Sequence, residues 1–184
     1  MNREALEHLI RAAAAITNES ELVIIGSQSI LGAVPSAPEE LLHSREADIY
    51  PLNNPDAIDM IDGAIGEDSP FDAHFGYYAQ GVGPETAILP AGWKDRLVKI
   101  QNQNTDLKIG YCLAPIDLAA SKLAAGREKD YLFVKAMICH SIIDADELRE
   151  HARHLPVDAQ GQARIASWIE MTKRSHDKAA PRNG

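Results

Sequence analysis

A short apolar segment that stops at a glycine and a serine constrains the fold of this chain more than any other feature. Leu22–Ile25 consists of four apolar residues, a pattern typical of a buried β-strand. Gly26 and Ser27 follow at once, and the segment that continues to about Ala33 has helical character. The sequence therefore predicts a strand, a tight turn and a short helix. Such a turn offers backbone N–H groups and a hydroxyl to a phosphate, with close approach at the glycine, or it only redirects the chain.

The order of the remaining predicted elements favours an α+β fold. Strands are expected in the middle of the chain, at Arg45–Tyr50, Phe75–Val82, Leu97–Ile100 and Lys108–Leu113. One helix is expected over residues 3–17, and a second is expected to begin after a cap at Asn54. Four more are expected later in the chain, from Pro115 to Gly126 and over 127–143, 146–155 and 163–173. This order predicts a sheet-containing core over residues 1–113, a helical part over 114–174 and a flexible tail over 175–184.

Charge and cysteine content narrow the class of protein. The chain has 184 residues and a net charge of −9, which disfavours nucleic acid or anionic lipid as a partner for the whole surface. Cys112 and Cys139 lie in apolar runs, and two buried thiols favour a reducing compartment. The N-terminus lacks the layout of a signal peptide, and no apolar run approaches the ~20 residues that span a bilayer. We therefore expect a soluble cytoplasmic protein without a membrane partner.

The predicted second strand carries an acidic pair. In an extended segment Ala47 and Ile49 would point to the core, and Glu46 and Asp48 would point together to the other face. At a rise of roughly 3.3 Å per residue their Cα atoms would lie ~7 Å apart. Two readings stay open: a solvated acidic face, or a pair of carboxylates that binds Mg²⁺.

These segments together resemble a known family. The order of "IIGSQSIL" and "READIY" is similar to that of the DNA polymerase β-like nucleotidyltransferase superfamily. The later stretch "DLAASKLAAGREKD", residues 117–130, resembles a bacterial branch that includes abortive-infection nucleotidyltransferase toxins and their uncharacterised relatives. The resemblance covers roughly residues 20–143 and implies a mixed β-sheet flanked by helices, with a C-terminal helical subdomain.

The resemblance also implies roles for individual residues. Gly26 and Ser27 would contact the triphosphate of a nucleoside triphosphate (NTP), and Glu46 and Asp48 would hold Mg²⁺. Lys122 would lie against the phosphates, and Asp130 would match a functional acid of the toxin branch. Arg127 and Lys129 would reach phosphate or the acceptor. Without the resemblance, both Lys122 and Asp117 have ordinary interpretations. Lys122 can be a solvated surface lysine, and Asp117 can be a carboxylate that complements a helix dipole.

Three departures from the family pattern stand out. The insert "GAVPSAPEELLHS" separates the Gly-Ser turn from the acidic pair, and the first acid is glutamate where aspartate is more usual. A third metal-facing acid is often found on the next strand of the family, where this chain offers only Gln80. Asp72 and Glu85 flank that predicted strand, and Asp106 lies in the predicted hairpin that follows it. None of the three matches the position of the family's third acid.

Two functional hypotheses follow from the resemblance. The first is an enzyme that transfers a nucleoside monophosphate from an NTP to an acceptor hydroxyl on tRNA, a protein or a small molecule, with Mg²⁺ as the cofactor. The acidic net charge argues against a large RNA footprint. The second is a catalytically degenerate nucleotide-binding protein that acts as a partner in a toxin–antitoxin or defence pair.

Overall fold

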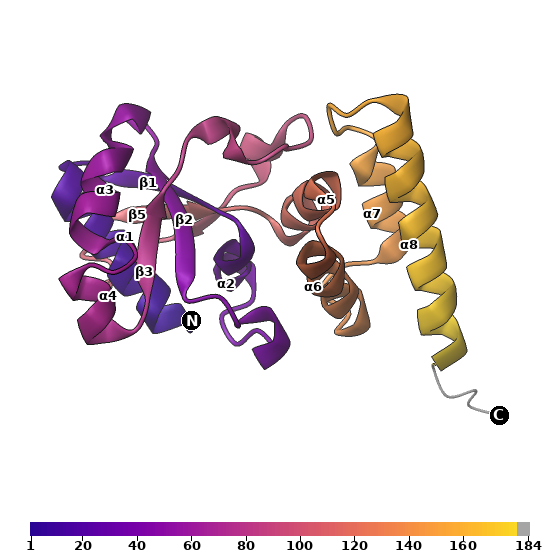
Figure 1. The fold of residues 1–184 in the computed structure, drawn as a ribbon, viewed down its shortest axis with the longest axis horizontal. Coiled ribbons are helices and arrows are strands. Elements are labelled where there is room, and N and C mark those ends of the chain that lie inside the picture. The colour runs from indigo at the N-terminus through magenta and orange to yellow at the C-terminus, as the bar shows by residue number, and fades with distance from the viewer. Residues whose placement is uncertain (180–184) are drawn as a thin grey trace. The chain divides into compact units, whose positions relative to one another are not determined.

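The structure is a computed structural model that describes residues 1–179 (Figure 1). The chain forms two compact units. The first contains residues 1–87 and 93–114, and the second contains residues 88–92 and the chain from Pro115 onward.

The first unit is built on a mixed five-stranded sheet with the strand order β3-β2-β1-β5-β4. Its strands are β1 (Glu21–Ile25), β2 (Glu46–Pro51), β3 (Tyr78–Gly81), β4 (Val98–Ile100) and β5 (Ile109–Cys112). The central strand β1 pairs antiparallel with β2 and parallel with β5. Strand β3 pairs parallel with β2, and β4 pairs antiparallel with β5. Successive side chains of β1 point to opposite faces and Leu22–Ile25 are all buried, so burial on both faces explains why this segment is continuously apolar.

Helices cover one face of this sheet. They are α1 (Arg3–Thr17), α2 (Ile30–Ala33), α3 (Ile58–Ile65) and α4 (Pro70–Phe75), of which α1, α3 and α4 lie together beside the strands in Figure 1. A Cβ atom on Gly110 of β5 would lie 2.5 Å from the side chain of Ile10, so α1 packs directly on the sheet there. A Cβ atom on Gly81 of β3 would lie 2.4 Å from the carbonyl oxygen of Ile58 in α3. Both glycines therefore mark close helix–sheet contact.

The opposite face of the sheet carries most of the polar side chains. Strand register places these residues on that face: Glu46, Asp48, Tyr78, Gln80, Glu21 and Tyr111. The apolar residues of the same face, Val23 and Ile25, are nevertheless buried. This face therefore has buried apolar side chains on β1 and ionisable or hydrogen-bonding side chains around them.

Four helices form most of the second unit (Figure 1). They are α5 (Pro115–Ala125), α6 (Glu128–Cys139), α7 (Ala145–Ala152) and α8 (Ala159–Ala179). Its core contains buried apolar side chains from each helix: Leu123, Val134, Met137, Leu148, Ile165 and Ile169. Within residues 1–179, no helix combines the length and the apolar character that crossing a membrane requires.

The α+β class and the predicted strands are confirmed, and several details of the prediction are wrong. Phe75 ends helix α4 and does not begin the third strand, which starts at Tyr78. The helix expected to reach Ile143 ends at Cys139, because the chain turns at Ser141 with a φ of +55°. Cys112 is buried as expected, but Cys139, the last residue of α6, is exposed.

Other boundaries also differ. Asn54 occupies the predicted cap position with Pro55 in the first turn, but the element that begins there is the 3₁₀ turn Pro55–Ala57, which precedes α3, and the Asn54 side chain makes no capping hydrogen bond to it. Helix α8 starts before Ala163 and reaches Ala179, so residues 175–179 of the predicted tail are helical. Residues 180–184 of that tail lie outside the described residues.

Candidate active site

The glycine after β1 lies against the second acid of β2. Gly26 has φ +69° and ψ −168°, a region of backbone space that is essentially restricted to glycine. A Cβ atom at this position would lie 2.1 Å from Oδ2 of Asp48. The missing side chain was expected to admit a phosphate, but the space it leaves is occupied by the carboxylate of Asp48. The turn and the acid, 22 positions apart in sequence, are therefore in direct contact.

The segment after Gly26 is a 3₁₀ turn, Ser27–Ser29, that leads into α2. Ser29 Oγ donates a hydrogen bond of 2.8 Å to the carbonyl oxygen of Gly26, which closes the turn. Because α2 has only four residues, its dipole adds little to anion binding. Ser27 is half-buried at the start of this turn, next to the contact of Gly26 with Asp48.

Gln28 introduces an unusual polar group into this turn. Its side chain is fully buried, and within residues 1–179 neither its amide nitrogen nor its amide oxygen has a hydrogen-bond partner. An unsatisfied buried amide costs about 1–3 kcal/mol. Such a group calls for an explanation, which an ordered water or a ligand can supply.

The acidic pair is arranged as the alternation predicts. Ala47 and Ile49 are buried, whereas Glu46 and Asp48 are half-buried on the polar face. The hydroxyl of Tyr78, which lies opposite Glu46 on β3, donates a hydrogen bond of 3.2 Å to Glu46 Oε2. Gln80 lies opposite Asp48 in the same register.

The acids considered as a third metal ligand lie elsewhere. Asp72 is buried in α4, where its carboxylate forms an ion pair with Arg45. Glu85 is exposed in a 3₁₀ turn, and Asp106 is exposed in the turn before β5 with a φ of +52°. Among residues 1–179, no three His, Cys, Asp or Glu side chains form a group that would hold a metal ion. The neutral Gln80 is the residue that register places beside Asp48.

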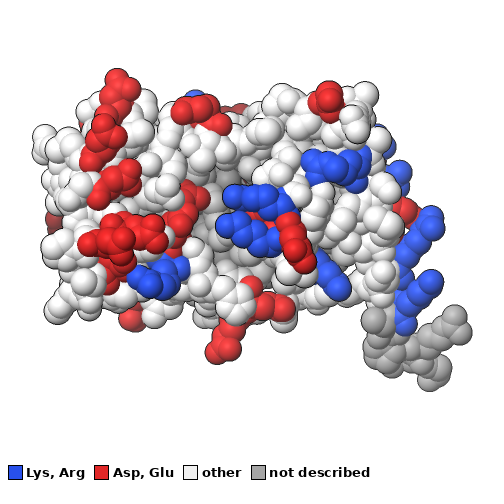
Figure 2. Space-filling view, viewed as in Figure 1, with Lys and Arg blue, Asp and Glu red and all other residues white. Residues whose placement is uncertain are grey.

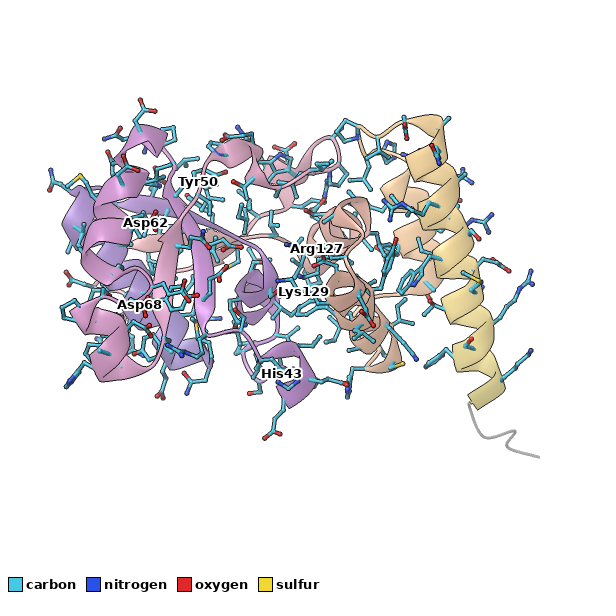
Figure 3. All side chains as sticks on the ribbon, in the orientation of Figure 1. His43, Tyr50, Asp62, Asp68, Arg127 and Lys129 are labelled. Atoms are coloured by element: carbon cyan, nitrogen blue, oxygen red, sulfur yellow. The ribbon has the colours of Figure 1, made fainter. Side chains whose placement is uncertain are left out.

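Three of the predicted residues of the second unit form one cluster. Asp130 is fully buried and accepts from Lys122 Nζ at 3.1 Å and from Arg127 Nε at 2.6 Å. Lys122 is buried in α5, and its Nζ lies 4.5 Å from the ring centroid of Phe133. Arg127 precedes α6 and Lys129 lies in its first turn, and Figure 3 labels both residues. Lys129 is exposed.

Burial and pairing shift the pKa values in this cluster. Burial alone would raise the pKa of Asp130, but the hydrogen bonds and charges of Arg127 and Lys122 outweigh it and hold that pKa below its usual value. Burial lowers the pKa of Lys122, and Asp130 offsets part of this effect. The pairing therefore keeps Asp130 ionised at neutral pH.

The structure also contains a polar pair that no local pattern indicates. Asp117 is fully buried in α5, and its Oδ1 lies 2.8 Å from Nε2 of His151 in α7. From the sequence, Asp117 is interpreted only as a carboxylate that complements a helix dipole. No local pattern pairs it with His151, because 34 positions separate the two residues.

Charge is unevenly distributed along the chain. Residues 1–114 contain 17 acidic and 7 basic side chains, a net charge of −10, whereas residues 115–184 contain 10 acidic and 11 basic side chains, a net charge of +1. In Figure 2, acidic side chains gather over the region of α3 and α4. The acidic pair thus lies in the unit that carries the negative charge.

Comparison with known proteins supports a family assignment. No curated protein and no solved structure matches the chain. One family model matches residues 4–176, which includes both the turn with its acidic pair and the cluster around Asp130. The chain therefore belongs to the family described as nucleotidyltransferases of unknown function (DUF6036).

Proposed function

We propose that the protein transfers a nucleoside monophosphate from an NTP to an acceptor hydroxyl. The observation that carries the proposal is the contact between the Gly26–Ser27 turn and Asp48, on the sheet face that also carries Glu46. A turn for phosphate and a pair of carboxylates are the parts that nucleotidyl transfer needs in one place.

The residues on this face fit Mg²⁺ as a cofactor. Glu46 and Asp48 supply carboxylate oxygens, the ligands that this hard cation prefers. The close packing of Gly26 on Asp48 restrains one of these carboxylates. When bound, Mg²⁺ neutralises negative charge on the phosphates and on the two acids. This neutralisation matters because the first unit, with a net charge of −10, would otherwise repel a triphosphate.

The chain's own residues have distinct roles in the proposed reaction. Within the first unit, Ser27 and the backbone at Gly26 contact the triphosphate. For Lys122, Arg127 and Lys129 of the second unit, contact with phosphate or acceptor stays a prediction from the resemblance. Asp130 orients Lys122 and Arg127 through the ion pairs described above. The acceptor oxygen forms a bond to the α-phosphorus as the bond to the bridging oxygen breaks. Pyrophosphate leaves, and the hydroxyl proton passes to solvent.

The acceptor is proposed on charge alone. A net charge of −9 disfavours a long RNA footprint, so a protein hydroxyl or a short exposed end of tRNA fits better. A relationship to abortive-infection toxins and to a cognate toxin–antitoxin partner stays a prediction from the resemblance.

A second candidate function is nucleotide binding without transfer. Gln80 favours it, because a neutral amide lies beside Asp48 where a further carboxylate would complete a metal site. Binding of NTP and Mg²⁺ without pyrophosphate release would support this candidate. Binding followed by release would support the transferase.

The Asp48→Asn variant tests the metal role that both candidates share. We expect this variant to keep its fold and to lose Mg²⁺-dependent binding of NTP, because a neutral amide cannot replace the charge of a carboxylate ligand. Asp106→Asn is the matched control, since Asp106 is exposed in a turn of the same unit. Isothermal titration with NTP and Mg²⁺ measures binding, and a pyrophosphate assay measures transfer. Equal binding and release in Asp48→Asn and the wild type would reject the proposal.

A further inference from the structure

The side chain of Glu46 has a hydrogen-bond donor on the neighbouring strand. The hydroxyl of Tyr78 donates to Glu46 Oε2 at 3.2 Å, and strand register pairs the two residues directly across β2 and β3. The Tyr78 side chain is largely buried at the edge of the sheet. This hydrogen bond holds Glu46 through one of its two carboxylate oxygens.

A second carboxylate, that of Glu67, lies near the hydroxyl of Tyr78. A phenol between two carboxylates has a single proton to share. Glu67, which follows α3, is therefore a second acceptor near the same hydroxyl.

The ring of Tyr78 is held by its surroundings. The guanidinium carbon of Arg45 lies 6.0 Å from the ring centroid. Arg45 is fixed in turn by its ion pair with Asp72 and by a hydrogen bond of 3.0 Å from Nε to the carbonyl oxygen of Gly76. The backbone N–H of Tyr78 donates to the carbonyl oxygen of Arg45 at 3.0 Å. A donor held in this way can orient Glu46 before a ligand arrives.

We infer that Tyr78 is a positioning residue that fixes Glu46 for a divalent cation. This inference rests on the proposed function, in which Glu46 and Asp48 are the metal ligands. Hydrogen bonds to ligating side chains orient them, and their loss typically weakens metal binding about 10- to 100-fold. Tyr78 itself does not touch the ion or the substrate.

The experiment is a titration of the purified full chain with Mn²⁺, a paramagnetic substitute for Mg²⁺, followed by electron paramagnetic resonance. We expect Tyr78→Phe to weaken Mn²⁺ binding about tenfold, because the ring is kept and only the hydroxyl is lost. Tyr111→Phe is the matched control: Tyr111 donates to Glu21 at 2.9 Å on the same face of the same sheet, on β5 and β1. This variant is expected to bind Mn²⁺ like the wild type.

A second variant separates this inference from the proposed function. If Asp48→Asn binds Mn²⁺ as the wild type does, the metal role of the acidic pair fails. If Asp48→Asn loses the ion while Tyr78→Phe keeps wild-type affinity, only the positioning role of Tyr78 is overturned. An equal loss in Tyr78→Phe and Tyr111→Phe would indicate a general loosening of the sheet and would also overturn it. At high Mn²⁺ concentration the cation site of Tyr78→Phe is expected to fill, because the proposed ligands Glu46 and Asp48 remain in this variant.

Discussion

At the scale of single residues, Gly26 connects backbone conformation to the acidic pair. Its φ of +69°, and the distance of 2.1 Å that would separate a Cβ atom from Asp48 Oδ2, are two independent reasons why only glycine fits. A residue expected to admit phosphate therefore also determines where a carboxylate can lie. Stability and metal binding are expected to change together at this position.

The Gly26→Ala variant tests this connection. We expect a loss of at least about 1–3 kcal/mol in the free energy of unfolding from backbone strain, and weaker Mn²⁺ binding because Asp48 must move. Urea denaturation measures the first effect and an Mn²⁺ titration the second. Gly76→Ala is the control: Gly76 also has a positive φ, +75°, but a Cβ atom there would meet nothing within 4 Å. Its Mn²⁺ affinity should equal that of the wild type, and a similar loss of affinity in both variants would contradict this connection.

Replacing Gln28 is predicted to stabilise the fold, whereas Gly26→Ala is predicted to destabilise it. Its buried amide lacks partners within residues 1–179, so Gln28→Met should raise the free energy of unfolding by about 1–2 kcal/mol. If the amide serves a nucleotide or an ordered water at the turn, the same variant should bind NTP more weakly. Urea denaturation and NTP titration measure the two effects. A destabilised variant would show that the amide is satisfied in the folded protein.

At the scale of elements, the first turn of α6 is stabilised by a charge cluster. Asp130 is fully buried between Lys122 of α5 and Arg127, which directly precedes α6. Removing one partner from a buried ion pair leaves an uncompensated charge and costs about 3–5 kcal/mol. The cluster therefore joins α5 to α6.

Asp130→Asn is expected to lower the free energy of unfolding by about 3–5 kcal/mol at neutral pH. The folded-state pKa of Asp130 is below its usual value, so its contribution is fully present above the unfolded pKa of about 3.9. The contribution is lost as the pH falls through the lowered folded-state pKa. Thermal unfolding from about pH 7 to about pH 2 should show the gap between wild type and variant narrowing below about pH 4. A gap that stays constant over this whole range would contradict the pairing.

Local patterns were sufficient to predict most elements and insufficient to predict which side chains meet. The alternation around Ala47 and Ile49 placed Glu46 and Asp48 on one face. The helix expected over residues 3–17 coincides with α1, which Asn2 caps by accepting from the N–H of Ala5 at 2.9 Å. Helix α4 was missed because its short segment, Pro70–Phe75, adjoins aromatic residues that favour a strand.

Contacts between distant positions had no local signal. The partnership of Asp117 with His151, of Tyr78 with Glu46 and of Gly26 with Asp48 depends on strand order and helix packing. Several of these residues are notable in the sequence, but each for a local reason: a helix dipole, a tight turn or an acidic pair. Their pairing arises only when the chain is folded.

At the scale of the whole molecule, the uneven charge leads to a prediction about the proposed cation. The first unit has a net charge of −10 and the rest of the chain has +1. A triphosphate would meet repulsion at the acidic unit unless divalent ions neutralise it. Nucleotide binding to this protein is therefore expected to require Mg²⁺ rather than merely to be strengthened by it.

The reactivity of the two cysteine thiols can measure whether nucleotide binding depends on Mg²⁺ in the intact protein. Cys112 lies fully buried in β5, and burial raises its pKa to about 12, whereas Cys139 is exposed at the end of α6. A disulfide reagent should label Cys139 at once and Cys112 only when the sheet opens. A non-hydrolysable NTP with Mg²⁺, at about 100 times its Kd, should slow Cys112 labelling roughly 100-fold if opening is a pre-equilibrium. Cys139→Ser isolates the Cys112 signal, and adding Asp48→Asn should remove the protection. Protection without Mg²⁺ would contradict the cation requirement, and protection that survives Asp48→Asn would show that the nucleotide binds without the acidic pair.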